Sequence, residues 1–362
     1  MHLLRKLLSL FLLLSLGLLQ VVVAQSPSSQ TPDPPPDEER TTTPVLSPAH
    51  KPGDSAQAPS GQQGVEQSDN GTFTIRKKVE EVVLHATVVD QKQRLVSGLR
   101  QNDFTVFEDG RPMTITTFHQ EDIPVAIGIV IDNSGSMRDK RQKVNQAALN
   151  LVRASNPQDE LFVVNFNDEY WLDQDFTSDI DKLREGLEHI ESRGGTALYD
   201  AVVASADHLA KGARLDRKVL LVVTDGEDNA SRESLEQCVR RLQDLNGPTV
   251  YSIGLLGDDR EAHRAKRALT ALAIQTGGIA YFPKDLNDVD NISRQVAHDI
   301  RNQYTIGYKP VDPNRPGYRK VNVEAHAPGY KHLVVRTRSG YYAGQDEHRD
   351  GHAQRRTTSR RD

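Results

Sequence analysis

Three short stretches of the sequence carry small, oxygen-bearing side chains. The stretch IVIDNSGSM places Asp132, Ser134 and Ser136 directly after an apolar run. Thr196 lies in SRGGTALYD, and Asp225 follows the apolar run KVLLVVT. Two carboxylates and three hydroxyls are hard oxygen ligands, which suit Mg²⁺, Mn²⁺ or Ca²⁺ rather than Zn²⁺. We therefore expect a divalent-cation site, with Mg²⁺ as the first choice and Mn²⁺ or Ca²⁺ as alternatives.

Each stretch taken alone has a simpler interpretation. The residues of DNSGS are all turn formers, Thr196 could cap a helix, and Asp225-Gly226 could form a turn. The argument for a shared site therefore rests on their order, their places at strand ends and their common chemistry.

The segment 121–303 contains the elements that would position these residues. Short apolar runs such as VAIGIVI, ELFVVNF, KVLLVVT and TVYSIGL alternate with segments of helical spacing. This alternation predicts an α/β fold: a doubly wound, mostly parallel, Rossmann-like sheet with helices on both faces. Ligands bind such sheets beyond the carboxyl ends of the strands, where Asp132 and Asp225 fall. The Gly194-Gly195 pair lets the loop before Thr196 turn tightly toward them.

Two β-rich segments, 73–120 and 304–343, flank the α/β region. Both contain strand-like runs, and Asp109-Gly110 gives a hairpin signal within the longer sequence EDGRP. Each segment is small for an independent β-domain. Our hypothesis is that they pair into one smaller β-sandwich-like domain into which the α/β domain is inserted. The alternative is two separate β-extensions.

The two ends of the chain have different compositions. Residues 1–24 read as a signal peptide, because Arg5 and Lys6 precede an apolar stretch that ends at Ala24. An uncleaved anchor is the alternative. Residues 25–72 are rich in proline and serine and predict a disordered linker, and the polar tail 344–362 also predicts disorder. We therefore expect a secreted or periplasmic protein without an integral membrane segment after cleavage.

The net charge bears on nucleic-acid binding, and the cysteine content bears on disulfide formation. The formal net charge is −5, which argues against general nucleic-acid binding because that requires a basic face. The single cysteine, Cys238, excludes an internal disulfide and is expected to be a small buried apolar residue.

The combined pattern resembles the von Willebrand factor type A (VWA) domain and its metal-ion-dependent adhesion site. The family pattern is D-x-S-x-S, then a threonine before a helix, then an aspartate closing a later strand, and all five positions match here. The resemblance implies that Ser134, Ser136 and Thr196 contact the metal most directly. It implies that Asp132 and Asp225 bind the metal directly or through water. Members of the family usually bind proteins, often through an acidic residue of the partner.

The layout of the whole chain is also similar to uncharacterised, secreted bacterial proteins that carry this domain. The similarity lies in the stretches VSGLRQNDFTVFEDGRP, GGTALYDAV and RNQYTIGYKP, and in the ending RSGYY. This resemblance implies a family but neither a partner nor an activity.

Three functions remain open from the sequence. The first is a metal-dependent, adhesion-type binding module that captures an acidic residue of a protein partner and is not an enzyme. The second is a metal-dependent hydrolase that would use the same metal for phosphoryl or ester hydrolysis. Asp200, four residues after Thr196, could orient a bound water or be an ordinary surface carboxylate. The sequence has no G-x-S-x-G, H-E-x-x-H or P-loop motif. The third is a structural envelope scaffold with a stabilising metal.

Overall fold

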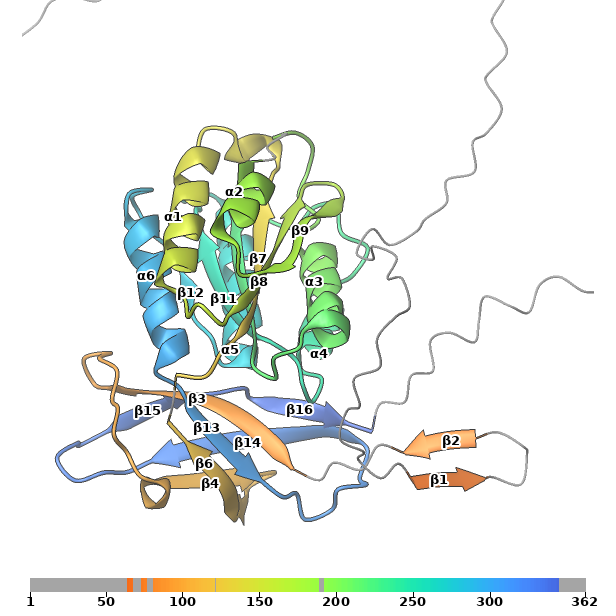
Figure 1. The fold of residues 1–362 in the computed structure, drawn as a ribbon, viewed down its shortest axis with the longest axis vertical. Coiled ribbons are helices and arrows are strands. Elements are labelled where there is room, and N and C mark those ends of the chain that lie inside the picture. The colour runs from red at the N-terminus through yellow and green to blue at the C-terminus, as the bar shows by residue number, and fades with distance from the viewer. Residues whose placement is uncertain (1–63, 68–72, 77–80, 121, 189–191, 345–362) are drawn as a thin grey trace, which may run out of the picture. The chain divides into compact units, whose positions relative to one another are not determined.

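A computed structural model describes residues 64–67, 73–76, 81–120, 122–188 and 192–344 (Figure 1). The predicted signal peptide, most of the predicted linker and all but Gly344 of the predicted tail lie outside these described residues. Every described residue belongs to one compact unit, which lies within Pro44–Asp362. Within the described residues, no helix has the length and apolar character needed to cross a membrane.

A six-stranded sheet forms the centre of the α/β region. The strand order is β12-β11-β10-β7-β8-β9, and every neighbouring pair is parallel except β8 and β9. The strands are β7 (Ala126–Asp132), β8 (Glu160–Phe166), β9 (Tyr170–Thr177), β10 (Lys218–Thr224), β11 (Thr249–Gly254) and β12 (Ala280–Tyr281). The predicted doubly wound, mostly parallel sheet is confirmed.

Helices cover both faces of this sheet (Figure 1). One face packs against α1 (Arg141–Ala154), α2 (Ile180–Glu188) and α6 (Asp288–Arg301). The other packs against α3 (Leu198–Gly212), α4 (Leu235–Leu242) and α5 (Arg260–Thr276). The central strand β7 serves both layers because Ile129 and Val130, neighbours in sequence, belong to opposite apolar cores. Burial on both faces explains why its sequence is a continuous apolar run.

The sequence analysis does not predict β9 or α2. All residues of β9 are only partly buried, and its antiparallel pairing with β8 contains two register shifts. An edge strand of this kind needs neither a continuous apolar run nor a strict alternation, so its sequence carries a weak signal.

The strands of the two β-rich segments pair with one another in two four-stranded sheets. Their orders are β15-β3-β13-β6 and β16-β14-β4-β5. The strands are β3 (Val82–Asp90), β4 (Phe104–Glu108), β5 (Arg111–Met113), β6 (Ile115–His119), β13 (Tyr304–Tyr308), β14 (Gly317–Ala325), β15 (Leu333–Arg336) and β16 (Gly340–Ala343); a short 3₁₀ helix, η1 (Gln101–Asp103), precedes β4. Residues from both sheets, among them Leu84 and Val323, share one apolar core. Since β6 precedes the α/β region and β13 follows it, the α/β domain lies between two strands that pair directly.

Two local features differ from the sequence expectations. The β4–β5 hairpin has a two-residue loop, in which Asp109 and Gly110 have φ angles of 49° and 79°. This backbone matches the strand twist of a hairpin, so the loop is shorter than the sequence EDGRP suggested. Residues Gly64–Gln67, expected within the disordered linker, form strand β1 and pair antiparallel with β2 (Phe73–Arg76).

The carboxyl end of α6 is hydrogen-bonded to β11, to β15 and to the residue before β10. The buried Asp299 carboxylate accepts hydrogen bonds from the Tyr251 hydroxyl at 2.5 Å and from Arg336 Nη2 at 2.8 Å. Arg217 donates to the Ile300 carbonyl and, at 2.5 Å, to Gln303 Oε1. Because only two residues separate the end of α6 from the start of β13, these contacts fix the direction in which the chain returns to the β-sheets.

His85 on β3 provides a test of this junction. Its Nδ1 lies 3.4 Å from the Thr305 hydroxyl, and burial, followed by the positive charges of Arg217 and Arg338, lowers its pKa from 6.5 to about 3. The unfolded chain therefore binds a proton below pH 6.5 that the folded chain does not take up until about pH 3. This one residue should remove up to about 1.4 kcal/mol of folding stability per pH unit across that window.

We expect His85→Gln to flatten the fall of stability between pH 6.5 and pH 3, measured by urea unfolding at several pH values. The matched control is His326→Gln, since the His326 side chain is 83% exposed. Parallel pH curves for wild type and His85→Gln would contradict a neutral imidazole in the folded protein.

Candidate metal centre

Asp132 ends β7, and its side chain is completely buried. Its Oδ1 accepts the backbone N–H of Ser134 at 2.7 Å, and its Oδ2 accepts the Thr224 hydroxyl at 2.5 Å. Burial raises the pKa of Asp132; the hydrogen bonds from Thr224 and Ser134 oppose this rise, and the charge of Asp225 adds to it. A positive charge nearby would therefore stabilise the ionised carboxylate.

A chain of hydrogen bonds joins the loop after β7 to the loop after β10. The hydroxyls of Ser134 and Ser136 lie 3.2 Å apart, and Ser136 donates to Asp225 Oδ1 at 2.7 Å. The serines flank the start of a short 3₁₀ helix, η2 (Gly135–Met137). Asp225 follows β10, the neighbour of β7 in the sheet. The pairing of these two strands thus brings the two loops together.

Thr196 is buried just before α3, next to the loop that follows β10. Its hydroxyl oxygen is 3.5 Å from the point that a Cβ on Gly226 would occupy, so it lies beside the turn that carries Asp225. Its N–H donates to Asn229 Oδ1 at 2.9 Å, and its carbonyl accepts the N–H of Asn229 at 3.0 Å. Asn229 therefore fixes the backbone of Thr196 against the loop that follows β10.

The loop after β7 and the loop before α3 are also joined through their backbones. The Gly135 N–H donates to the Gly194 carbonyl at 3.4 Å, and the Arg193 N–H donates to the Asn133 carbonyl at 3.1 Å. Gly194 has a φ of 71°, and a Cβ there would lie 2.0 Å from Asp168 Oδ2. Both the conformation and the close approach require glycine, as expected of a tight turn.

Two basic residues that the sequence analysis does not single out lie beside the carboxylates. Lys140 immediately precedes α1, and its ammonium forms an ion pair with Asp225 Oδ2. Arg141 is 1% exposed and donates to Asn165 Oδ1 at 2.8 Å. Burial lowers the pKa of Arg141 to about 10, although the charge of Asp132 opposes this. Both residues look like ordinary polar residues at a helix start, so no local sequence signal points to them.

The carboxylate of Asp200 is engaged by the backbone of a neighbouring loop. It accepts the backbone N–H groups of Arg232 at 3.0 Å and Glu233 at 2.9 Å. It therefore holds the segment that follows the Asp225 loop. Asp228 acts similarly, accepting the Tyr199 N–H at 3.0 Å in the first turn of α3.

The side chains of Asp132, Ser134, Ser136, Thr196 and Asp225, which we call the candidate metal centre, offer a donor set that fits a hard divalent cation. They supply two carboxylates and three hydroxyls, whereas an octahedral ion takes six oxygens. Gly135 and Ser136 are exposed, so solvent reaches the site from this side. An ion held here would therefore keep room for water or for an outside oxygen ligand. Among the described residues, the centre included, no three His, Cys, Asp or Glu side chains gather so as to hold a metal, so an ion here would depend on the hydroxyls as well as on the two carboxylates.

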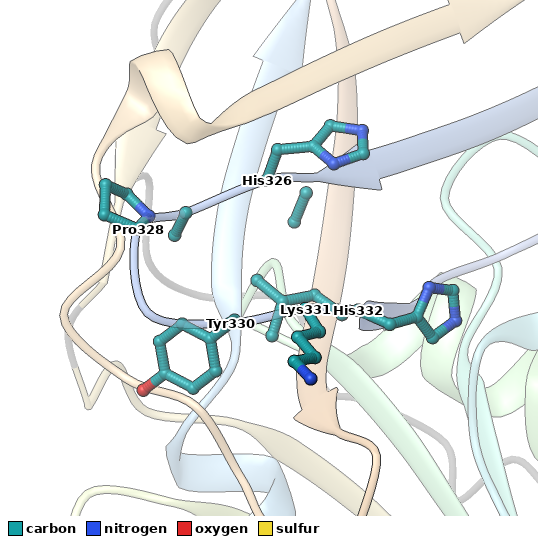
Figure 2. Close-up of a pocket in the computed structure, with 8 residues that line it drawn as sticks. His326, Pro328, Tyr330, Lys331 and His332 are labelled. Carbon is teal, nitrogen blue, oxygen red and sulfur yellow. The ribbon is translucent and has the colours of Figure 1, made fainter.

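A hollow of about 280 Å³ lies in a different place, in the loop between β14 and β15. Figure 2 shows the imidazole rings of His326 and His332 on separate arms of this loop, with Lys331 and Tyr330 pointing elsewhere. Because these groups do not converge on one point, the hollow does not compete with the candidate metal centre as a site for an ion.

The sequence of the region that carries the candidate metal centre matches a known domain. Residues 127–227 match the family model of the von Willebrand factor type A domain, and this span includes all five residues of the centre. The chain contains a VWA domain. The resemblance noted from the motifs is thus confirmed at the level of the domain.

One relative is similar to this chain over about half of its length. The uncharacterised protein sll0103 of Synechocystis sp. is 26% identical over 189 residues, which cover 51% of this chain and 43% of that protein. This chain therefore matches less than half the length of that relative.

Among solved structures, BatB from Bacteroides thetaiotaomicron is 19% identical with a TM-score of 0.40, covering 49% of this chain and 98% of BatB. A von Willebrand factor type A protein from Catenulispora acidiphila is 16% identical with a TM-score of 0.42, covering 74% of this chain and 75% of that one.

The hydroxyl of Thr224 tests how Asp132 is held. Thr224→Val should leave Asp132 Oδ2 buried without its donor and lower the free energy of unfolding by about 1–3 kcal/mol. The control Thr224→Ser keeps the hydroxyl and should retain more stability than the valine variant, measured by urea unfolding. A valine variant as stable as wild type would show that this hydrogen bond is not needed.

Proposed function

We propose that the candidate metal centre binds a divalent cation and, through it, an acidic residue of a protein partner outside the cytoplasm. A VWA domain suggests a protein-binding or adhesion module, which agrees with this role. The observation that carries the proposal is the hydrogen-bonded series from Ser134 through Ser136 to Asp225, with Asp132 held beside it by Thr224.

The charges of the centre favour an external acidic ligand. Two carboxylates balance only the double charge of the cation, which therefore remains able to attract a further carboxylate. Ser136 is exposed, whereas Asp132 and Thr196 are buried, so a ligand would approach over the η2 loop. The predicted signal peptide would direct the chain to the secreted or periplasmic location that this role requires.

Calorimetric titration of Mg²⁺, Mn²⁺ and Ca²⁺ into the metal-stripped full chain tests the metal site. We expect saturable binding to wild type that weakens more than about tenfold in Asp132→Ala and in Thr196→Ala. Glu227→Gln is the matched control, because this carboxylate lies two residues after Asp225 but binds Arg264 Nε at 2.5 Å. Binding that is absent, or indifferent to both alanine substitutions, would overturn the proposal.

The acidic-ligand step has a separate test on the Mn²⁺-loaded chain. Acetate, as a carboxylate probe, should change the electron paramagnetic resonance spectrum of the bound Mn²⁺, whereas chloride at equal ionic strength should not. Mg²⁺-dependent hydrolysis of p-nitrophenyl phosphate that disappears in Asp132→Ala would contradict a binding role and favour the hydrolase.

A further inference from the structure

Lys140 makes a contact that the proposed function does not require. Its ammonium forms an ion pair with Asp225 Oδ2, while Asp225 Oδ1 accepts the Ser136 hydroxyl. Both oxygens of this candidate ligand are therefore engaged by the chain itself. A divalent cation that used Asp225 Oδ2 would have to share that oxygen with a positively charged group.

The need for a counter-ion at Asp225 follows from burial. The Asp225 side chain has no exposed surface, and a buried carboxylate is costly unless it is paired with a cation or a metal. Lys140 supplies such a charge. Its pairing with Asp225 thus stabilises the fold before any ion binds.

Lys140 is also able to leave. Its side chain is 34% exposed, so the ammonium has a path to solvent. Its backbone N–H donates to the Met137 carbonyl at 2.9 Å, which ties its base to the η2 loop that carries Ser136. The base of Lys140 is therefore held near the centre by the short loop that supplies Ser134 and Ser136, and its flexible side chain lets the ammonium move away.

We propose that Lys140 is a tethered counter-ion of the candidate metal centre, which holds Asp225 Oδ2 in the metal-free protein and gives up that oxygen when a divalent cation binds. This inference rests on the proposed function. It makes Lys140 a residue that sets the cation concentration at which the centre fills, since an ammonium beside the ion repels it. Once displaced, the ammonium remains close enough to attract an incoming carboxylate.

Four variants of the full chain test the assignment by titration of Mg²⁺ alone. Lys140→Met removes the charge but keeps an unbranched apolar stem, and we expect it to bind Mg²⁺ about tenfold more tightly than wild type. Lys140→Arg keeps the charge and should bind Mg²⁺ with an affinity close to that of wild type. Lys143→Met is the matched control, because this exposed lysine three residues on donates to Asn287 Oδ1 at 2.7 Å. Asp225→Asn should weaken binding whatever stands at position 140.

A thermal readout separates competition from a merely structural contact. In the chelator EDTA, Lys140→Met should melt below wild type and Lys143→Met, because Asp225 loses its counter-ion. Excess Mg²⁺ should then raise the melting temperature of Lys140→Met by more than it raises that of wild type.

The possible results distinguish the two proposals. If wild type binds Mg²⁺ and Lys140→Met leaves the affinity unchanged or weakens it, the counter-ion assignment is overturned. The proposed metal site is then unaffected. Failure of both wild type and Lys140→Met to bind Mg²⁺ would overturn the proposed function and the counter-ion assignment with it.

Discussion

The pairing of β7 with β10 is the constraint on which the rest of the site depends. Its register sets Ile131 opposite Val223, so the next residues of the two strands, Asp132 and Thr224, meet side by side and Asp225 follows at once. Two carboxylates at one edge of a buried sheet repel each other and lose hydration. The Thr224 and Ser136 hydroxyls and the Lys140 ammonium offset this repulsion and lost hydration, because each donates to one of the two carboxylates. The loops thus supply donors for two carboxylates that the pairing of the strands places close together.

The sequence was sufficient for the parts of the structure that local pattern encodes. Continuous apolar runs gave the buried parallel strands, and the position of Asp132 and Asp225 after such runs placed both at one edge. The contacts of Lys140, Asp168 and Asn229 were beyond its reach. Each is a polar residue of unremarkable local context whose partner lies 27 to 85 residues away. Only the folded arrangement of the three loops gives these residues their roles.

The limits were similar at the level of elements. Edge strand β9 is only partly buried along its whole length, helix α2 spans only nine residues, and the β4–β5 hairpin depends on left-handed backbone angles at Asp109 and Gly110. Pairing between the two β-rich segments could be framed as a hypothesis from their small size. Which strand lies beside which is decided by side-chain packing across both sheets, and no short stretch of sequence encodes that packing.

The place of β13 in its sheet has a consequence for biosynthesis. This strand lies between β3 and β6, yet it is translated after the whole α/β domain. Until it emerges, β3 and β6 lack their central partner and expose unpaired strand edges, which are prone to association with other chains. Prior folding of the α/β domain would shorten the loop that must close, since its two ends meet where Thr305 pairs with His119. Folding of the inserted domain would thus bring together the two strands that flank it, β6 and β13.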